Sequence, residues 1–318
     1  MKNLHMIGVT GANGFVGSTL VSRLVHDGIP VTAFARVPNL MPCNAGMNIR
    51  EFPDLDRSSD FSDITKDIDV LIHCAARVHV MNDSSADPLS VFLNANFEAT
   101  VNLARSAAKA GVVRFIFISS IKVNGDATKA GKPYTEQCPP TTQDPYGISK
   151  YRAEKELMKI AEQTGMEVVI IRPVLVYGPG VKGNMSRLIK LVRKKWPLPF
   201  GSVDNKRSMI GITNLVDLIL TCLDHPRARN QIFLASDGND RSLSQILRCL
   251  SDVSDSRSMT FRFPARLLKY FLYYIGKKDI ADRLLGSLQV DISKAKKELG
   301  WIPKMKVDDE LRQCMKFK

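Results

Sequence analysis

The chain has 318 residues, of which 44% are hydrophobic and 24% are charged, and its 45 Lys and Arg against 32 Asp and Glu give a formal net charge of +13. This composition excludes an intrinsically disordered chain, and the length is enough for one large or two modest domains with a sizeable core. The excess of positive charge fits three kinds of partner, namely nucleic acid, an anionic membrane surface or a ligand that carries phosphate.

The absence of targeting signals and the pattern of the cysteines narrow the class of protein further. The first ten residues contain no apolar stretch of signal-peptide length, and no segment reaches about 18 uninterrupted apolar residues, so neither a signal peptide nor a membrane span is expected. The six cysteines are scattered without a CxxC pair, which argues against a zinc site or a disulfide framework. We therefore expect a cytoplasmic protein with reduced thiols and no bound metal.

The first half of the chain alternates apolar, β-branched runs with amphipathic segments. Strands are predicted over residues 6–10, 31–35, 70–75, 114–119 and 168–171, and helices over 15–25, 93–103 and 146–164. Continuous apolar strands that alternate with helices are typical of a parallel sheet covered on both faces. We therefore predict an α/β protein with a doubly wound sheet.

The pattern changes after Tyr177. Gly178-Pro-Gly180 and Trp196-Pro-Leu-Pro199 interrupt the alternation, and the later segments are less regular. We expect a first domain over residues 1–177 and a smaller second domain mainly over 178–318, some segments of which return to the first domain.

A glycine-rich loop joins the first predicted strand to the first predicted helix. Gly11 permits a tight turn, Gly14 lets the backbone approach a pyrophosphate, and Gly17 allows close packing of helix on sheet. The helix N-terminus adds unpaired N–H groups and the positive end of its dipole. A plain strand–turn–helix connection is the alternative, and the βαβ context favours a dinucleotide site. Its predicted residues are Gly11, Asn13, Gly14, Phe15, Val16 and Gly17.

The end of the second strand bears on the choice of dinucleotide. An Asp or Glu at this place accepts a hydrogen bond from the ribose 2′-hydroxyl of NAD, whereas an Arg accommodates the 2′-phosphate of NADP. The strand ends Phe34-Ala35-Arg36 with no carboxylate, so Arg36 favours NADP. A surface arginine beside a loop is the alternative.

A tyrosine and a lysine four residues apart form a candidate acid–base pair. Tyr146 and Lys150 share one face of a predicted helix, and a nearby ammonium is expected to lower the tyrosine pKa from its usual value of about 10. Such a phenol exchanges a proton with a substrate hydroxyl. The YxxxK pattern occurs four times, starting at Tyr146, Tyr151, Tyr273 and Tyr274. Only Tyr146 follows a strand that ends in serines, Ser119 and Ser120, so the context selects it.

Together these features resemble the extended short-chain dehydrogenase/reductase family. The resemblance rests on the glycine loop, Ser119-Ser120, Tyr146-x-x-x-Lys150 and Arg172-Pro-x-x-x-Tyr177, and it extends to Leu299-Gly-Trp301 near the end of the chain. Within the family the chain is similar to UDP-hexose 4-epimerases and related nucleotide-sugar enzymes. The resemblance implies a Rossmann-type dinucleotide-binding domain, a second domain for a nucleotide sugar, and bound NAD or NADP.

The resemblance also implies roles for individual residues. Tyr146 would be the acid–base group, Lys150 its electrostatic partner and a contact of the ribose, and Ser120 would hydrogen-bond the oxygen at sugar carbon 4. Further cofactor contacts would be Asp54, Leu55, Cys74, Ala75, Ala76 and Pro173, in addition to Tyr146 and Lys150. The substrate side would include Asn96, Asn184, Arg207 and Arg283, in addition to Ser120.

Departures from the family pattern leave two reactions open. Ile121-Lys122 replaces the Asp-Glu pair of the similar 4,6-dehydratases, which argues against dehydration, and Asn124 stands where many 4-epimerases carry tyrosine. The leading hypothesis is 4-epimerisation of a UDP-hexose or UDP-N-acetylhexosamine for surface-polysaccharide synthesis. The alternative is an NADPH-dependent 4-keto reductase of a UDP-2-acetamido-dideoxy-hexos-4-ulose, which Arg36 favours. A cofactor-binding scaffold or NADP sensor is less favoured, because such proteins often lose the tyrosine that this chain keeps.

An apolar, aromatic segment over residues 264–276 has basic residues on both flanks. That composition suits a helix that lies in an anionic membrane interface. A core or dimer helix with charged ends is the alternative, and we favour it. We expect a homodimer with no nucleic-acid partner, in the cytoplasm or peripherally at the inner face of the membrane.

Overall fold

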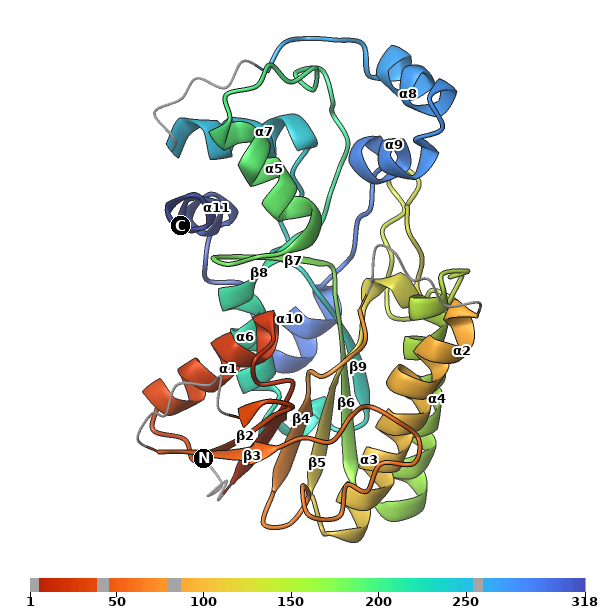
Figure 1. Cartoon of the computed structure of the whole chain (residues 1–318), viewed down its shortest axis with the longest axis vertical. Helices are drawn as coiled ribbons and strands as arrows, with labels where there is room; N and C mark the ends of the chain where they lie inside the picture. The colour runs from red at the N-terminus through yellow and green to blue at the C-terminus, as the bar shows by residue number, and fades with distance from the viewer. Residues whose placement is uncertain (1–5, 39–45, 79–86, 254–259, 318) are drawn as a thin grey trace.

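The computed structural model describes residues 6–38, 46–78, 87–253 and 260–317. Its centre is a seven-stranded sheet in the order β3-β2-β1-β4-β5-β6-β9, in which every neighbouring pair is parallel (Figure 1). The strands are β1 (Ile7–Thr10), β2 (Val31–Ala35), β3 (Met47–Glu51), β4 (Val70–His73), β5 (Arg114–Ile118), β6 (Glu167–Pro173) and β9 (Gln231–Ala235). The predicted α/β, doubly wound fold of Rossmann type is thereby confirmed.

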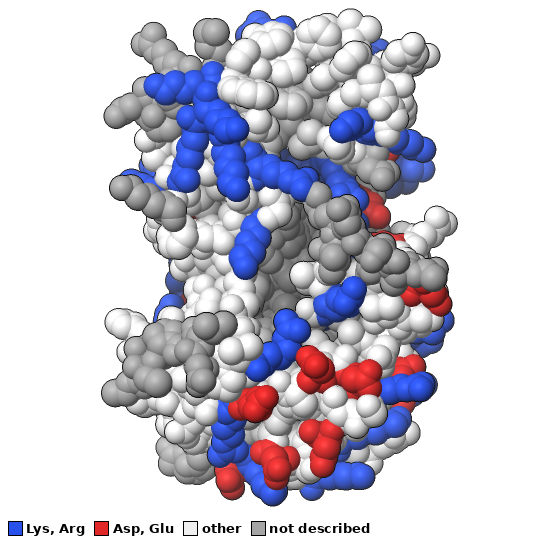
Figure 2. All heavy atoms as spheres, viewed as in Figure 1, with Lys and Arg blue, Asp and Glu red and all other residues white. Residues whose placement is uncertain are grey.

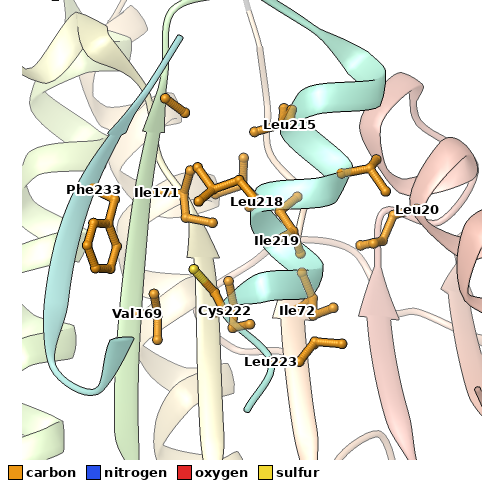
Figure 3. Close-up of a cluster of buried hydrophobic side chains, with 14 of the residues drawn as sticks. Leu20, Ile72, Val169, Ile171, Leu215, Leu218, Ile219, Cys222, Leu223 and Phe233 are labelled. Atoms are coloured by element: carbon orange, nitrogen blue, oxygen red, sulfur yellow. The ribbon is translucent and has the colours of Figure 1, made fainter. Parts of the chain in front are cut away.

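Helices cover both faces of this sheet, because its inner strands are apolar on both sides. On one face lie α1 (Phe15–His26) and α6 (Ile212–Thr221), with α10 (Ser293–Leu299) beside β9. On the other face lie α2 (Pro88–Leu93), the π-helical η2 (Asn94–Glu98), α3 (Ala99–Lys109) and α4 (Pro145–Thr164). Figure 3 shows the apolar side of α6, including Leu215, Leu218 and Ile219, facing the side chains of the strands.

A second lobe lies beyond the carboxyl ends of the strands (Figure 1). Its core is formed mainly by α5 (Gly183–Arg193), α7 (Leu243–Val253) and α11 (Val307–Lys316). The two-stranded parallel sheet of β7 (Leu175–Tyr177) and β8 (Met209–Gly211) connects the lobes, and α8 (Ala265–Tyr274) and α9 (Lys278–Leu285) form a hairpin at the far end. The two short helices are η3 (Ile121–Val123) and η4 (Pro226–Ala228).

The face seen in Figure 1 is hollowed between the two lobes. Figure 2 shows Lys and Arg side chains gathered on the upper lobe and around the hollow, whereas the acidic side chains visible on this face lie mostly below it. Within the described ranges, no helix is long and apolar enough to cross a membrane, and no three His, Cys, Asp or Glu residues are grouped so that they could hold a metal ion.

Candidate active site

In the predicted dinucleotide loop, the backbone at Gly11 lies close to the backbone of the turn after β4. Gly11 has a φ of +67°, and a Cβ at this position would lie 2.7 Å from the amide nitrogen of Ala75. A Cβ on Gly17 would overlap the carbonyl oxygen of Gly11. Gly14 precedes α1, and no side chain from the described residues caps the first turn of that helix. The N–H groups of this turn are therefore available to an anion, so the loop fits the pyrophosphate of a dinucleotide. Asn13 is exposed and Phe15 and Val16 are half-buried.

The residues predicted to contact adenosine lie at the same edge of the sheet. Arg36 follows β2, and its Nη1 lies 3.9 Å from Oδ1 of Asp54, which follows β3. Both side chains are exposed, at 74% and 86%, so this ion pair is weak and either group can turn toward a ligand. Leu55 is half-buried and packs against the core between the sheet and helices α3 and α4.

The turn after β4 packs directly on the glycine loop. The amide of Cys74 donates to the carbonyl oxygen of Thr10 at 3.3 Å, and the amide of Ala75 donates to Oγ1 of Thr10 at the same distance. Cys74, Ala75 and Ala76 are each half-buried. This turn therefore forms a wall beside the predicted dinucleotide loop, as a cofactor-lining segment requires.

His73, at the end of β4, is a buried group that the sequence did not single out. Its Nδ1 lies 2.7 Å from Oγ1 of Thr10 and its Nε2 lies 3.1 Å from Oγ1 of Thr100, so both ring nitrogens have hydroxyl partners. Burial, together with the charge of Lys150, lowers the pKa of His73 to about 3. His73 is therefore neutral at physiological pH and holds β1, β4 and α3 together.

This shift predicts a loss of stability in acid. Because the folded pKa of His73 lies below its unfolded value of 6.5, stability is complete above about pH 6.5 and falls as the pH drops toward 3. Between about pH 7 and 4.5 the loss amounts to about 3 kcal/mol from this residue. Urea unfolding at a series of pH values should show a shallower dependence for His73→Gln, whereas exposed His26→Gln should follow the unaltered chain. Equal slopes for all three proteins would contradict this role.

The three predicted catalytic side chains come together where β5 meets α4. Ser120 follows β5 and begins η3, where its Oγ accepts from the amide of Lys122 at 3.2 Å. Tyr146 is the second residue of α4 and forms a hydrogen bond with Ser120. Lys150, one turn farther along, is buried, and its Nζ donates to the carbonyl oxygen of Ile118 at 2.9 Å.

The electrostatics of Tyr146 differ from the expectation based on its spacing to lysine. Burial raises the pKa of Tyr146 and the charge of Asp144 raises it further, while the hydrogen bond with Ser120 lowers it. Lys150 Nζ lies 6.0 Å from the centre of the Tyr146 ring, and burial lowers the pKa of Lys150 to about 8. The expected lowering of the tyrosine pKa is therefore not found in this structure, because burial and the Asp144 charge together raise the pKa more than the hydrogen bond with Ser120 lowers it. The raised pKa favours the neutral phenol, which is the form that donates a proton.

A lysine stands beside the acidic cap of α4. Asp144 caps this helix, and its Oδ1 accepts from the amide of Tyr146 at 3.3 Å. Lys122 Nζ lies 3.4 Å from Oδ2 of Asp144 and also pairs with Asp126. The residue that departs from the dehydratase pattern is thus a cation that offsets the acidic cap next to Tyr146.

A buried ion pair that the sequence analysis missed holds α4 against the sheet. Glu154 and Arg172 are 2% and 3% exposed, and the guanidinium donates to the carboxylate through Nε at 2.9 Å and Nη2 at 2.5 Å. Oγ of Ser119, the residue before Ser120, donates to Oε1 of Glu154 at 2.5 Å. Arg172 Nη1 donates to Oδ1 of Asn124 at 3.0 Å. Asn124 is therefore part of a buried structural network that includes Ser119, the residue before the predicted catalytic Ser120.

Asn96 and Pro173 lie close to the same edge of the sheet. Asn96 is buried in η2, where its Nδ2 donates to the carbonyl oxygen of Arg77 at 2.9 Å and to Oγ of Ser149 at 3.3 Å. Its Oδ1 accepts from the amide of Arg77 at 2.8 Å. The structure thus gives Asn96 a positioning role between the turn after β4 and α4, and its predicted substrate contact stays a prediction. Pro173 ends β6 and is buried.

The residues predicted to hold a diphosphate lie in the second lobe. Arg207 is half-buried, and its Nη1 donates to the carbonyl oxygen of Gly286 at 3.3 Å. Burial lowers the pKa of Arg207, and the charge of Asp126 raises it, which places Arg207 near the segment after η3. Asn184 is exposed in the first turn of α5, and Arg283 is exposed in the last turn of α9. Of these three residues, Arg207 is therefore the one that interacts with the first lobe, near the predicted catalytic Ser120.

The fold and the site are those of an α/β enzyme that binds a dinucleotide beside a serine, a tyrosine and a lysine. The model of the NAD dependent epimerase/dehydratase family matches residues 7–235, and the chain belongs to this family. The expected family, enzymatic class and dependence on a nicotinamide dinucleotide are thereby confirmed.

Individual relatives and solved structures show which enzymes of this family the chain is similar to. The chain is 47% identical over 308 residues to a UDP-glucose 4-epimerase of Vibrio cholerae, which covers 96% of this chain and 93% of the relative. The UDP-glucose 4-epimerase of Thermotoga maritima, solved with UDP-glucose, matches with a TM-score of 0.79 and 23% identity over 98% of each chain. The RMD protein of Pseudomonas aeruginosa, solved with NADPH, matches with a TM-score of 0.73 and 22% identity over 98% of each chain.

Proposed function

We propose that the protein is a 4-epimerase of a UDP-hexose or UDP-N-acetylhexosamine, in the synthesis of surface polysaccharide. The observation that carries this proposal is the 47% identity to the Vibrio cholerae UDP-glucose 4-epimerase over 96% of this chain. Because the likeness extends over 96% of this chain, it takes in most of the second lobe, where a nucleotide sugar would bind. A high identity over both lobes therefore supports a shared substrate class as well as a shared fold.

The geometry of the site supports a reaction at a carbinol carbon. Ser120 and Tyr146 share a hydrogen bond at the carboxyl end of β5, next to the dinucleotide loop. Bound NAD or NADP supplies the acceptor and donor of hydride. Tyr146, acting as the phenolate, would take the proton of the carbon-4 hydroxyl as the sugar is oxidised and would return it as the keto sugar is reduced on its opposite face. Ser120 hydrogen-bonds the same oxygen, and Lys150 contacts the ribose.

The binding sites follow from the positions of the lobes. We assign the cofactor to the first domain, residues 1–177, with the glycine loop on the pyrophosphate and Arg36 and Asp54 near adenosine. We assign the nucleotide sugar to the side of the second domain, mainly residues 178–318, with Arg207 on the diphosphate, because a guanidinium binds phosphate through paired hydrogen bonds.

Arg36 favours a second candidate function, an NADPH-dependent 4-keto reductase of a UDP-2-acetamido-dideoxy-hexos-4-ulose. Its guanidinium stands 74% exposed at the end of β2, where it could meet a 2′-phosphate, and Asp54 faces it at 3.9 Å. The protonated phenol of Tyr146 is also the form that a reductase needs to protonate a keto oxygen. The reductase uses the same residues once and consumes NADPH.

One assay separates the two functions. Purified protein is incubated with UDP-galactose and with UDP-N-acetylgalactosamine without added reductant, and the nucleotide sugars are resolved by chromatography. We expect the corresponding 4-epimer from at least one of them and a cofactor that stays bound through turnover. No epimer from either sugar would refute the 4-epimerase, and oxidation of NADPH by the 4-keto UDP-sugar would then establish the reductase.

We further propose that the chain acts in the cytoplasm as a homodimer and touches the inner face of the membrane through residues 264–276. The dimer would be checked by analytical ultracentrifugation.

A further inference from the structure

Helix α8 carries an apolar stripe on its solvent side. Leu267, Tyr270, Phe271 and Tyr274 recur at the i, i+3, i+4, i+7 spacing that places side chains on one face of a helix. Their exposed fractions are 59%, 79%, 58% and 87%, whereas Leu268 on the other side is buried. An apolar helical face normally turns toward the core, and here it turns away from the molecule. Such a contiguous exposed patch marks an interaction surface.

The structure holds this stripe outward. Helix α8 packs against α9 at the far end of the second lobe (Figure 1). On the flank of the stripe, the hydroxyl of Tyr273 donates to Oδ1 of Asp282 at 2.5 Å, and Nζ of Lys269 lies 3.2 Å from the same oxygen. These contacts fix the rotation of α8 relative to α9. The four stripe residues therefore project away from the hairpin.

Cations border the apolar stripe. Arg266 precedes Leu267 in the first turn of α8, Arg262 lies in the segment before the helix, and Lys277 and Lys278 follow it. Over residues 260–283 the sequence has six basic and two acidic residues. Such a face suits the boundary between the acyl chains and the anionic headgroups of a bilayer. The aromatic and aliphatic side chains would enter the acyl region, and the ammonium and guanidinium groups at the border would reach the headgroup phosphates.

We propose that the α8–α9 hairpin docks on an anionic phospholipid surface, with Leu267, Tyr270, Phe271 and Tyr274 in the interface and the neighbouring Arg and Lys on the headgroups. This inference gives residues and a lipid class to the membrane contact proposed above, and it does not depend on which reaction the site performs. A protein groove would accept the same apolar spacing, but the density of cations around the stripe favours an anionic bilayer.

The hairpin is tied to the rim of the cleft. Nδ2 of Asn205 donates to the carbonyl oxygens of Leu284 and Gly286, at the end of α9, at 3.0 and 2.8 Å. Nη1 of Arg207, the predicted diphosphate ligand, donates to Gly286 as well. Docking of α8 would therefore hold the nucleotide-sugar side of the cleft near the membrane, where a membrane-bound enzyme that consumes the sugar nucleotide could receive it.

The test is sedimentation of the full-length protein with vesicles of phosphatidylcholine, with and without phosphatidylserine. We expect binding only with phosphatidylserine, and weaker binding as salt is added. Tyr270→Ser with Tyr274→Ser should abolish it, whereas Val113→Ser with Ile302→Ser, a matched change at exposed apolar residues elsewhere, should not. Arg266→Gln with Lys277→Gln should weaken binding roughly fivefold per cation, whereas Lys296→Gln with Lys297→Gln on α10 should leave it unchanged.

Several results would overturn the inference. They are absence of binding to either vesicle, binding that the α8 variants leave unchanged, and a dimer that becomes monomeric in the α8 variants without any vesicle binding. UDP-sugar turnover in solution is measured on the same samples. Loss of vesicle binding with unchanged turnover separates this surface from the catalytic site, and absent turnover with intact binding would count against the proposed reaction alone.

Discussion

Replacement of Tyr146 by phenylalanine is expected to lower kcat by about 10²–10⁴-fold, the range that a positioned acid–base group contributes. The substitution removes one hydroxyl from a site where it is hydrogen-bonded to Ser120 and leaves the ring in place. Because the pyrophosphate loop is untouched, the affinity for the dinucleotide should change little. Turnover by chromatography and dinucleotide affinity by titration measure the two effects separately.

The chain supplies its own control for this experiment. Tyr151 lies on the same helix and also begins a Tyr-x-x-x-Lys sequence, with Nζ of Lys155 5.8 Å from the centre of its ring. It points in a different direction from Tyr146, since five residues turn a helix by about 140° beyond a full turn. Tyr151→Phe should therefore retain turnover. Full activity in Tyr146→Phe, or an equal loss in both variants, would refute the assignment of Tyr146.

Glu154→Gln is expected to lower the free energy of unfolding by about 3–5 kcal/mol. The substitution leaves the guanidinium of Arg172 buried without an opposite charge, and breaking one partner of a buried pair has this order of effect. It also weakens the hydrogen bond from Ser119, so Ser120 should be held less firmly. Urea unfolding measures the free energy of unfolding. The kcat value, measured at temperatures well below the thermal unfolding midpoint, shows whether Ser120 is still held in position.

Glu156→Gln makes the same chemical change two residues away. Glu156 pairs with the exposed Arg105 and Lys159, and pairs of this kind contribute less than about 1 kcal/mol. Replacement of Glu154 and Arg172 together by apolar residues should recover part of the loss, because no charge is then left unpaired. Equal losses in Glu154→Gln and Glu156→Gln would show that burial of the Glu154 pair has no energetic consequence.

The helices and strands that could be predicted from the sequence are those whose own residues are strongly apolar or amphipathic. The inner strands over 31–35 and 114–118 are continuous apolar runs that have no amphipathic alternative, and the helix predicted over 146–164 is observed over 145–164. Strand β3 was missed because it is a half-exposed edge strand with the sequence MNIRE. Strand β9 was missed because nothing local indicates that a segment after residue 178 pairs with β6.

Spacing and context led to the candidate catalytic residues, but not to their surroundings. Gly11 and Ser120 follow strands, whose carboxyl ends share one edge of a parallel sheet, and Tyr146 begins the helix after the second of these strands, so their proximity could be inferred. The Glu154–Arg172 pair joins residues that are 18 apart in different elements, and only the presence of Arg172 within an apolar strand could have drawn attention to it. The raised pKa of Tyr146 could not be inferred either, because it depends on burial in three dimensions.

The path of the chain has a consequence for engineering. Helix α6, strand β9 and helix α10 pack on the first sheet, although they lie between or beside segments that build the second lobe. No single cut in the polypeptide therefore separates the two lobes. A chimaera with the second lobe of a relative requires the exchange of several separate segments, such as those around α5, α7 and α11. The elements α6, β9 and α10, which lie between these segments in the sequence, have to keep their native residues. A simple crossover at residue 177 would leave the edge of β6 and the face beneath α6 to be covered by foreign side chains.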